Sequence, residues 1–222
     1  MFSYYGSKSK IVGYYPKPQH NKIIEPFAGS ARYSLKYWEN DITISDKYEK
    51  IISIWKYLQN CSISDIDRLP KLKKGETLDS FNFDCIEEKM LMGFIIQAGV
   101  NAPRLTCTEA GVRNQVTAIN NIKRDLHKIK HWKIIHSDYL DLKNETATWF
   151  IDPPYQFGGK YYIHKNIDYN QLKEWIMSRN GNVILCENTK ATWIDTTPIK
   201  RIQGLAQTNT TEAVWLSGSF LQ

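Results

Sequence analysis

The sequence of 222 residues lacks the signals of membrane, disulfide-stabilised and metal-binding proteins. Its longest apolar stretch, residues 90–100, is far shorter than the roughly 20 residues that a membrane-spanning helix needs. Residues 1–10 contain no apolar run of the kind found in signal peptides. The four cysteines form no Cys-x-x-Cys pair, and the single His-x-x-x-His pair, His127 and His131, has no cysteine close to it in the sequence. We therefore expect free thiols, no metal, no membrane and a cytoplasmic location.

Two common nucleotide-binding motifs are also missing. The sequence contains neither Gly-x-Gly-x-x-Gly nor a Walker A lysine motif, which disfavours chemistry on ATP. Acidic residues are missing from the first 24 residues, which carry four lysines. Together with the net charge of +6, this basic segment indicates a polyanionic partner, although solvated helix faces would give a similar balance.

Short apolar stretches that end in polar or acidic residues recur along the chain, at 23–24, 42–44, 133–135, 149–151 and 183–186. Such stretches are typical of buried strands in a parallel sheet. Amphipathic or helical patterns over 30–38, 47–60 and 168–179 lie between them, and Gly181 is interpreted as the stop signal of the last helix. Two more strands, 200–202 and 212–216, are predicted to flank a loop rich in Gln, Thr and Asn.

The stretch from 60 to 130 interrupts this alternation with glycines and prolines, and we interpret it as an insertion. The predicted fold class is α/β, with a Rossmann-like, mostly parallel twisted sheet and helices on both faces. Residues 1–59 and 131–222 form this part, and the insertion is small and mainly helical or loop. Because parallel strands end at a common edge, we expect the carboxylates that follow them to gather there, where ligands bind.

Asp152-Pro153-Pro154-Tyr155 is the most informative motif, because it directly follows the predicted strand 149–151. Proline lacks a backbone N–H, so the two prolines form a stiff turn rather than continuing a sheet. The turn presents a carboxylate, carbonyl groups and an aromatic ring. A flat heterocycle with an exocyclic amine needs such acceptors and such a stacking surface. Asp-Pro and Pro-Pro pairs are also common in turns without a functional role.

A second motif, Glu25-Pro26-Phe27-Ala28-Gly29-Ser30-Ala31, takes a strand into a turn of small residues that opens a helix. Gly29 allows close approach of the backbone to a ligand, and the helix start provides free N–H groups. Asp46 lies 17 residues after Gly29, at the end of the next strand. A carboxylate at that position is well placed to accept hydrogen bonds from ribose hydroxyls.

Taken in order, five segments resemble the Dam-like DNA adenine methyltransferases, which use S-adenosylmethionine. The segments are Phe2–Lys8, Glu25–Ser30, Asp46, Ser137–Tyr139 and Asp152–Tyr155. The resemblance covers most of the chain except the insertion, and it implies the class I methyltransferase fold. It further implies transfer of a methyl group to the 6-amino group of a flipped-out adenine at specific sites in double-stranded DNA.

The resemblance implies a role for each matching residue. In this family Asp46 would bind the cofactor's ribose, Asp138 would read its adenine ring, and residues 27–30 would wrap its methionine part. The implied cofactor contacts are Tyr4, Lys8, Glu25, Pro26, Phe27, Ala28, Gly29, Ser30, Asp46, Lys47, Asp138, Tyr139 and Asp152.

The catalytic turn implied by the resemblance consists of Asp152, Pro153, Pro154 and Tyr155. The Asp152 carboxylate and the Pro153 carbonyl would hold the two amine hydrogens, and Tyr155 would stack on the flipped base. Positioning then supplies most of the rate, and no cysteine has a catalytic role.

The sequence departs from the family pattern in three places. Ala31 stands where a second glycine is common, Tyr4 stands where tryptophan is usual, and the insertion does not reproduce the family's recognition hairpin. We nevertheless expect the insertion to recognise the target, and residues 158–162 to form a mobile flap over the base. The predicted nucleic-acid contacts are Lys10, Asn101, Arg104, Arg113, Asn114 and Lys160.

Alternatives remain open at this stage. RNA is a possible substrate, because single strands require no flipping from a duplex. Methylases of the cytosine 4-amino group and of protein glutamine use related turns, which usually begin with Ser or Asn, so Asp152 favours adenine. A decayed, non-enzymatic nucleic-acid-binding homologue is the other alternative. The sequence leaves open the recognition site, a cognate restriction nuclease as partner, and the oligomeric state.

Overall fold

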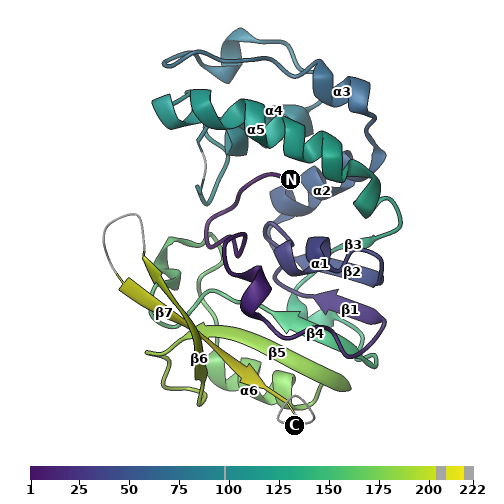
Figure 1. The fold of residues 1–222 in the computed structure, drawn as a ribbon, viewed down its shortest axis with the longest axis vertical. Helices are drawn as coiled ribbons and strands as arrows, with labels where there is room; N and C mark the ends of the chain where they lie inside the picture. The colour runs from purple at the N-terminus through teal and green to yellow at the C-terminus, as the bar shows by residue number, and fades with distance from the viewer. Residues whose placement is uncertain (98, 204–208, 218–222) are drawn as a thin grey trace.

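A seven-stranded sheet organises the structure, a computed structural model that describes residues 1–97, 99–203 and 209–217 (Figure 1). The strand order is β3-β2-β1-β4-β5-β7-β6. β1 to β5 run parallel, whereas β7 is antiparallel to both of its neighbours. The strands are β1 (Lys22–Glu25), β2 (Asp41–Asp46), β3 (Lys133–His136), β4 (Ala147–Ile151), β5 (Gly181–Asn188), β6 (Thr197–Gln203) and β7 (Asn209–Leu216). The prediction of a mostly parallel sheet is confirmed; the predicted loop between the last two strands falls on residues outside the described part.

Helices form where the periodic patterns predicted them. These are α1 (Arg32–Lys36), α2 (Glu49–Asn60) and α6 (Tyr169–Met177). The side chain of Asp168 caps α6 by accepting hydrogen bonds from the backbone N–H groups of residues 170 and 171. Gly181 is not the stop signal of this helix: it opens β5 with φ 95°, and a Cβ there would lie 2.2 Å from the Ala147 carbonyl oxygen. Short 3-10 turns are η1 (Val12–Tyr14), η4 (Tyr139–Asp141) and η5 (Gly159–Tyr161).

Alternate residues of the central strands face two different hydrophobic layers. In β4, Phe150 stacks on Tyr33 of α1 with ring centroids 4.2 Å apart. On the opposite face, Trp149 meets Trp175 of α6 at 5.5 Å. Because side chains alternate along a strand, both faces of β4 are buried, and helices cover both faces as predicted.

The insertion is mainly helical, as predicted, and Figure 1 shows its helices at one end of the molecule, beyond α2. It contains α3 (Ile63–Asp67), η2 (Leu78–Ser80), α4 (Ile86–Ile95), α5 (Glu109–Asp125) and η3 (Leu126–Ile129). Phe94 of α4 meets Phe2 at 5.7 Å and belongs to the same core as the sheet. The insertion is therefore anchored on the N-terminal segment rather than held by a linker alone.

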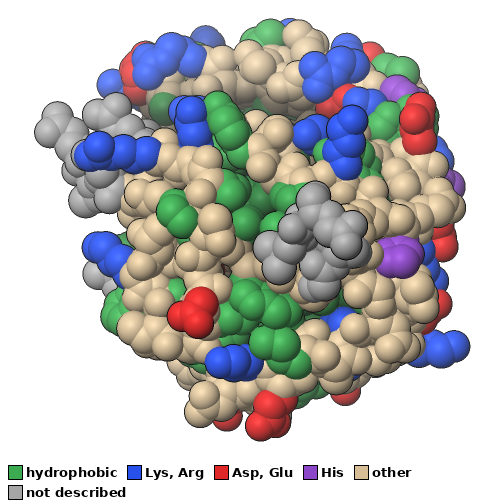
Figure 2. Space-filling model, turned by 60° about the horizontal axis from the view of Figure 1, so that its bottom comes forward, with side chains coloured by type: hydrophobic (Ala, Val, Ile, Leu, Met, Phe, Trp, Pro, Cys, Tyr) green, Lys and Arg blue, Asp and Glu red, His purple; other side chains and the backbone are tan. Residues whose placement is uncertain are grey.

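Charge and apolar surface are distributed unevenly on the face that Figure 2 turns toward the viewer. Hydrophobic side chains lie across its middle, and most Lys and Arg side chains lie toward its rim. In the described part of the chain, no helix is long and apolar enough to cross a membrane. The same residues contain no group of three or more His, Cys, Asp or Glu side chains that could hold a metal, and all four cysteines are free.

Candidate active site

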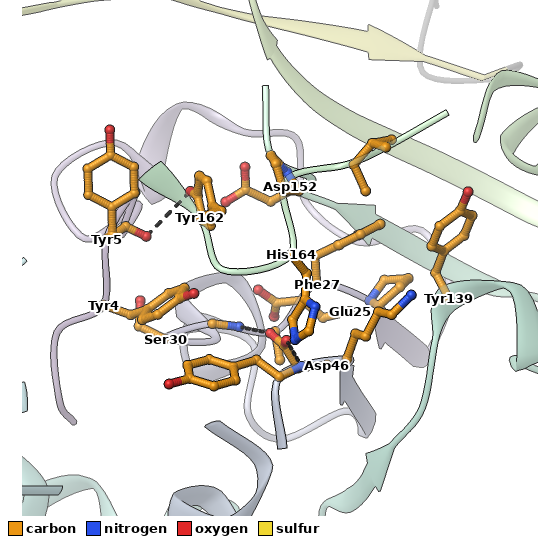
Figure 3. Close-up of a pocket in the computed structure, with 18 of the residues that line it drawn as sticks. Tyr4, Tyr5, Glu25, Phe27, Ser30, Asp46, Tyr139, Asp152, Tyr162 and His164 are labelled. Carbon is orange, nitrogen blue, oxygen red and sulfur yellow. Dashed lines mark hydrogen bonds between the residues drawn. The ribbon is translucent and has the colours of Figure 1, made fainter. Parts of the chain in front are cut away.

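A cavity of about 240 Å³ opens at the carboxyl ends of the central strands (Figure 3). It is lined by residues of the N-terminal segment 4–8, the β1–α1 loop 25–32, the end of β2, residues 138–140, the Asp152 turn and the segment 162–171. β1 pairs with both β2 and β4, so the chain leaves β1 in one direction and later returns to its other side. Ligands bind at such a switch point in open α/β sheets.

Carboxylates gather at this edge as the strand pattern predicted. Glu25, Asp46, Asp138 and Asp152 all line the cavity. Glu187 is the second-last residue of β5 but is buried outside the cavity lining, where its carboxylate accepts a hydrogen bond from the backbone N–H of residue 156 at 3.0 Å. The shared edge therefore brings together four of the five acids that follow predicted strands.

Asp46 joins the β1–α1 loop to the end of β2. Its two carboxylate oxygens accept backbone hydrogen bonds from Gly29 at 2.9 Å and from Tyr48 at 2.8 Å, drawn as dashed lines in Figure 3. Each oxygen keeps a second lone pair for a ligand hydroxyl. Burial raises the pKa of Asp46 to about 6, and the two backbone hydrogen bonds oppose that rise.

The N-terminal segment approaches the backbone at position 29 so closely that glycine is required there. Its φ is 45°, and a Cβ at this position would lie 3.0 Å from the ring of Tyr4. The Gly29 carbonyl accepts a hydrogen bond from the indole N–H of Trp55 at 2.9 Å. The loop is thus held between Tyr4 on one side and α2 on the other.

Polar contacts also fasten the N-terminal segment to the loop. The Ser30 hydroxyl donates to the Ser7 hydroxyl oxygen at 2.9 Å. The Arg32 guanidinium donates to the same Ser7 oxygen at 3.2 Å and to the Phe2 carbonyl at 2.7 Å. Two motifs that are distant in sequence therefore form one wall of the cavity.

Ala31 has the left-handed backbone conformation that glycine favours. With φ 43° and ψ 47°, it is the one non-glycine residue of positive φ among the described residues. This conformation costs an L-residue roughly 1–2 kcal/mol. The departure from the family's second glycine is therefore accommodated as a strained alanine at the start of α1.

Because of this strain, we expect position 31 to tolerate glycine but not valine. Ala31→Gly is expected to change the free energy of unfolding by less than about 1 kcal/mol, because relief of strain offsets the lost methyl group and the greater flexibility of the unfolded chain. Ala31→Val is expected to destabilise by about 2–4 kcal/mol, because a β-branched side chain disfavours positive φ and this position is buried. Urea denaturation would measure both, and equal losses for the two variants would contradict the assignment.

The other end of the cavity combines aromatic rings with a charged pair. The rings of Phe27 and Tyr139 lie 5.3 Å apart, and both residues line the cavity. Asp138 forms an ion pair with Lys47, with 2.7 Å between Oδ2 and Nζ. Burial tends to raise the pKa of Asp138, but the hydrogen bonds from Lys47 and from backbone N–H groups outweigh burial and hold the pKa below its usual value. An ionised acceptor beside aromatic rings suits a flat ring with an amino group.

The Asp152 turn meets Lys8 of the N-terminal segment. Lys8 Nζ lies 2.7 Å from Asp152 Oδ1, 3.9 Å from Glu212 Oε1 and 4.7 Å from the centroid of the Tyr155 ring. Burial disfavours the charged form of Lys8, but the two carboxylates outweigh burial and raise its pKa. Burial raises the pKa of Asp152 to about 6, opposed by Lys8 and reinforced by the negative charge of Glu212.

Only part of the predicted catalytic motif faces the cavity. Asp152 and Pro154 line the cavity, whereas Pro153 and Tyr155 lie outside its lining. The Tyr155 hydroxyl donates a hydrogen bond to Glu212. Its predicted stacking on a base stays a prediction, since the ring here lies beside Lys8.

Residues 4–85 match the family model for the D12 class N6 adenine-specific DNA methyltransferases. The resemblance to the adenine methyltransferases is confirmed. The matched segment contains the N-terminal motif, the β1–α1 loop and Asp46, and the mostly parallel sheet agrees with the class I methyltransferase fold. The family supports adenine methylation of DNA as the general activity, and DNA as the substrate. A search of curated proteins found no match.

The predicted nucleic-acid contacts lie away from the cavity lining. Lys10, Arg104, Arg113 and Asn114 are exposed, and their contact with DNA stays a prediction. Asn101 is half-buried, and its side chain donates a hydrogen bond to the Tyr161 carbonyl. The side chain of Lys160 lies outside the described part of the structure.

The segment after the Asp152 turn contributes cavity-lining residues that the motifs did not reveal. The cavity is also lined by Tyr162, His164, Asn166, Ile167, Asp168 and Gln171. The Tyr162 hydroxyl donates to the Tyr5 carbonyl at 3.4 Å, so the segment reaches the N-terminal motif (Figure 3). The aromatic residues after Gly158 were the available signal, but the direction in which the segment folds back depends on tertiary contacts.

Proposed function

We propose that this protein is a site-specific DNA adenine methyltransferase that transfers the methyl group of S-adenosylmethionine to the 6-amino group of a flipped-out adenine. One observation carries the proposal: the Asp152 turn, the Gly29 loop and Asp46 meet at a single cavity at the switch point of the sheet. The acceptor suited to the target amine therefore lies in the same cavity as the groups suited to the cofactor.

The charges of the cavity fit the proposed cofactor. Its lining includes five carboxylate side chains but only three Lys or Arg side chains, within a chain of net charge +6. S-adenosylmethionine carries a sulfonium and an ammonium against one carboxylate, so an acidic cavity favours it. Asp46 would accept from the ribose hydroxyls, and Phe27, Asp138 and Tyr139 would hold the adenine ring.

When bound, the cofactor supplies the methyl group: the N6 lone pair bonds to the methyl carbon, the carbon–sulfur pair stays on sulfur, and one N6 proton leaves to solvent. The contribution of the protein is to position the amine. The Asp152 carboxylate would accept one amine hydrogen, and the rigid prolines would hold the acceptor in place. Flipping the base costs a few kcal/mol, which these contacts must offset.

The decisive experiment measures methyl transfer from labelled S-adenosylmethionine to unmethylated duplex DNA, followed by digestion and mass spectrometry of the nucleosides. We expect 6-methyladenine as the modified base, and mapping of the methylated positions would then define the recognition site. RNA, tested in parallel, distinguishes the alternative nucleic acid. Methylated cytosine, or methylated RNA without methylated DNA, would overturn the proposal.

Cofactor affinity is expected to depend on pH through Asp46. Because burial raises the pKa of Asp46 to about 6, its carboxyl group is mostly ionised at pH 7.5 and mostly protonated at pH 5. A protonated group is the weaker acceptor for ribose hydroxyls, so affinity for S-adenosylhomocysteine should fall by about tenfold over this range. Calorimetric titration at both values measures the change.

Two variants test whether Asp46 causes this pH dependence of affinity. Asp46→Asn should bind weakly at pH 7.5 with a flatter profile, whereas Asp138→Asn should bind weakly but keep the profile, since the pKa of Asp138 is already low. A profile that is unchanged in Asp46→Asn would show that another group is responsible.

A further inference from the structure

Glu212 is a buried carboxylate that no motif brought to attention. It lies on β7, opposite Asn188 of β5, with only 4% of its surface exposed. Its Oε1 atom accepts hydrogen bonds from the hydroxyl of Tyr15 at 2.6 Å and from the hydroxyl of Tyr155. Lys8 Nζ lies 3.9 Å away from the same oxygen. This carboxylate therefore contacts both Tyr155 of the catalytic turn and the lysine that pairs with Asp152.

Lys8 is shared between two carboxylates. It is close to Asp152, at 2.7 Å, and more distant from Glu212, at 3.9 Å. The oxygen of Asp152 that holds Lys8 is also an acceptor suited to the target amine. An amine can take that oxygen only if Lys8 has a second partner nearby, because an unpaired buried charge is costly.

We propose that Glu212 is a positioning residue: it fixes the Tyr155 hydroxyl and becomes the partner of Lys8 when the target amine binds Asp152. This inference rests on the proposed methyl transfer and adds a role for a residue on a strand remote from the motifs. Glu212 is not itself among the residues that line the cavity, so its effect passes through Tyr155 and through Lys8, which does line it.

The charges around Asp152 allow the role of Glu212 to be tested through the pH dependence of the rate. The charged groups that act on or respond to Asp152 are Lys8 of the N-terminal segment, Glu25 of β1, Glu187 of β5 and Glu212 of β7. The other titratable groups there are Tyr15, Tyr155, Tyr162 and Cys186. Glu212 raises the pKa of Asp152, so its removal should move the acid limb of the pH–rate profile to lower pH.

The test compares Glu212→Gln, Tyr15→Phe and the exposed control Glu174→Gln in single-turnover methyl transfer to DNA. Glu212→Gln is expected to slow transfer by roughly 10- to 100-fold, as for a misplaced catalytic group. The affinity of this variant for S-adenosylhomocysteine should stay within about twofold of the wild-type affinity, and the acid limb of its pH–rate profile should move to lower pH. Tyr15→Phe and Glu174→Gln should transfer at nearly the wild-type rate.

Three results separate the possible failures. If the wild-type protein methylates no DNA, the proposed function fails. If wild type is active and Glu212→Gln keeps its rate, or if Tyr15→Phe reproduces the loss, this inference is wrong and Glu212 is only structural. If thermal unfolding shows that Glu212→Gln does not fold, Tyr155→Phe replaces it: a loss of about tenfold that Tyr15→Phe does not share supports the inference, and equal rates overturn it.

Discussion

Asp152→Asn is expected to reduce the rate of methyl transfer to adenine by about 10²–10³-fold, a loss typical for one preorganised hydrogen-bonding group in an active site. The substitution keeps the shape of the side chain but removes its charge and one acceptor. Lys8 then loses its partner at 2.7 Å and keeps Glu212 at 3.9 Å and the Gly6 carbonyl at 3.3 Å. Single-turnover transfer to duplex DNA measures the loss, and S-adenosylhomocysteine binding shows whether the cavity is intact.

A matched control for this variant is Asp195→Asn, because Asp195 is exposed and lies outside the cavity lining. It should transfer methyl groups at the wild-type rate. Transfer by Asp152→Asn at the rate of this control would contradict the assignment of Asp152 as the acceptor for the amine. If Asp152→Asn loses both methyl transfer and S-adenosylhomocysteine binding, the substitution has instead damaged the cavity.

Lys8→Met is expected to lower the free energy of unfolding at pH 8 by about 3–5 kcal/mol, the usual cost of removing one partner of a buried ion pair. Lys8 is buried and is the cation closest to both Asp152 and Glu212, so its loss leaves two carboxylates without their counter-ion. Methionine preserves most of the side-chain volume, and the loss is therefore electrostatic in origin. Urea denaturation at pH 8 provides the measurement.

The same variant should recover stability as the pH falls. With Lys8 removed, the folded-state pKa of Asp152 should lie above about 6, since Lys8 is the main group that opposes the rise caused by burial. A carboxyl group whose pKa is higher in the folded state destabilises the fold when ionised, and this penalty decreases as pH falls through that value. Lys10→Met, at an exposed position two residues later, should change stability by less than about 0.5 kcal/mol at either pH. Equal stabilities of the two variants at pH 8 would contradict the prediction.

Most elements of the fold were predictable because their signals are local. Each short apolar stretch became a strand, and the apolar spacing of residues 51, 54, 55 and 58 became the buried face of α2. Gly181 shows the limit of this reasoning. The pattern suggested a helix stop, but the residue opens β5 because a Cβ there would meet the neighbouring strand β4. A contact between strands decides that position, and no local pattern reports it.

The site shows the same division. Proline chemistry makes the Asp152 turn stiff, and strand ends place Glu25, Asp46 and Asp138 at one edge, so these groups could be predicted without coordinates. Which side chains of the turn face the cavity could not be predicted. Tyr155 points to Glu212 because β7 runs antiparallel beside β5 and carries that carboxylate under the turn.

The sequence by itself determined the strands, the helices, the stiff Asp152 turn and the resemblance to the family, because each depends on residues close together in the chain or on short motifs. Only the tertiary structure decided how Lys8 and Glu212 meet at Asp152, since these residues come from the N-terminal segment, the last strand and the middle of the chain. The pairing of buried charges depends on distances across the whole sheet. Local propensity carries no information about such distances, and packing of the complete fold sets them.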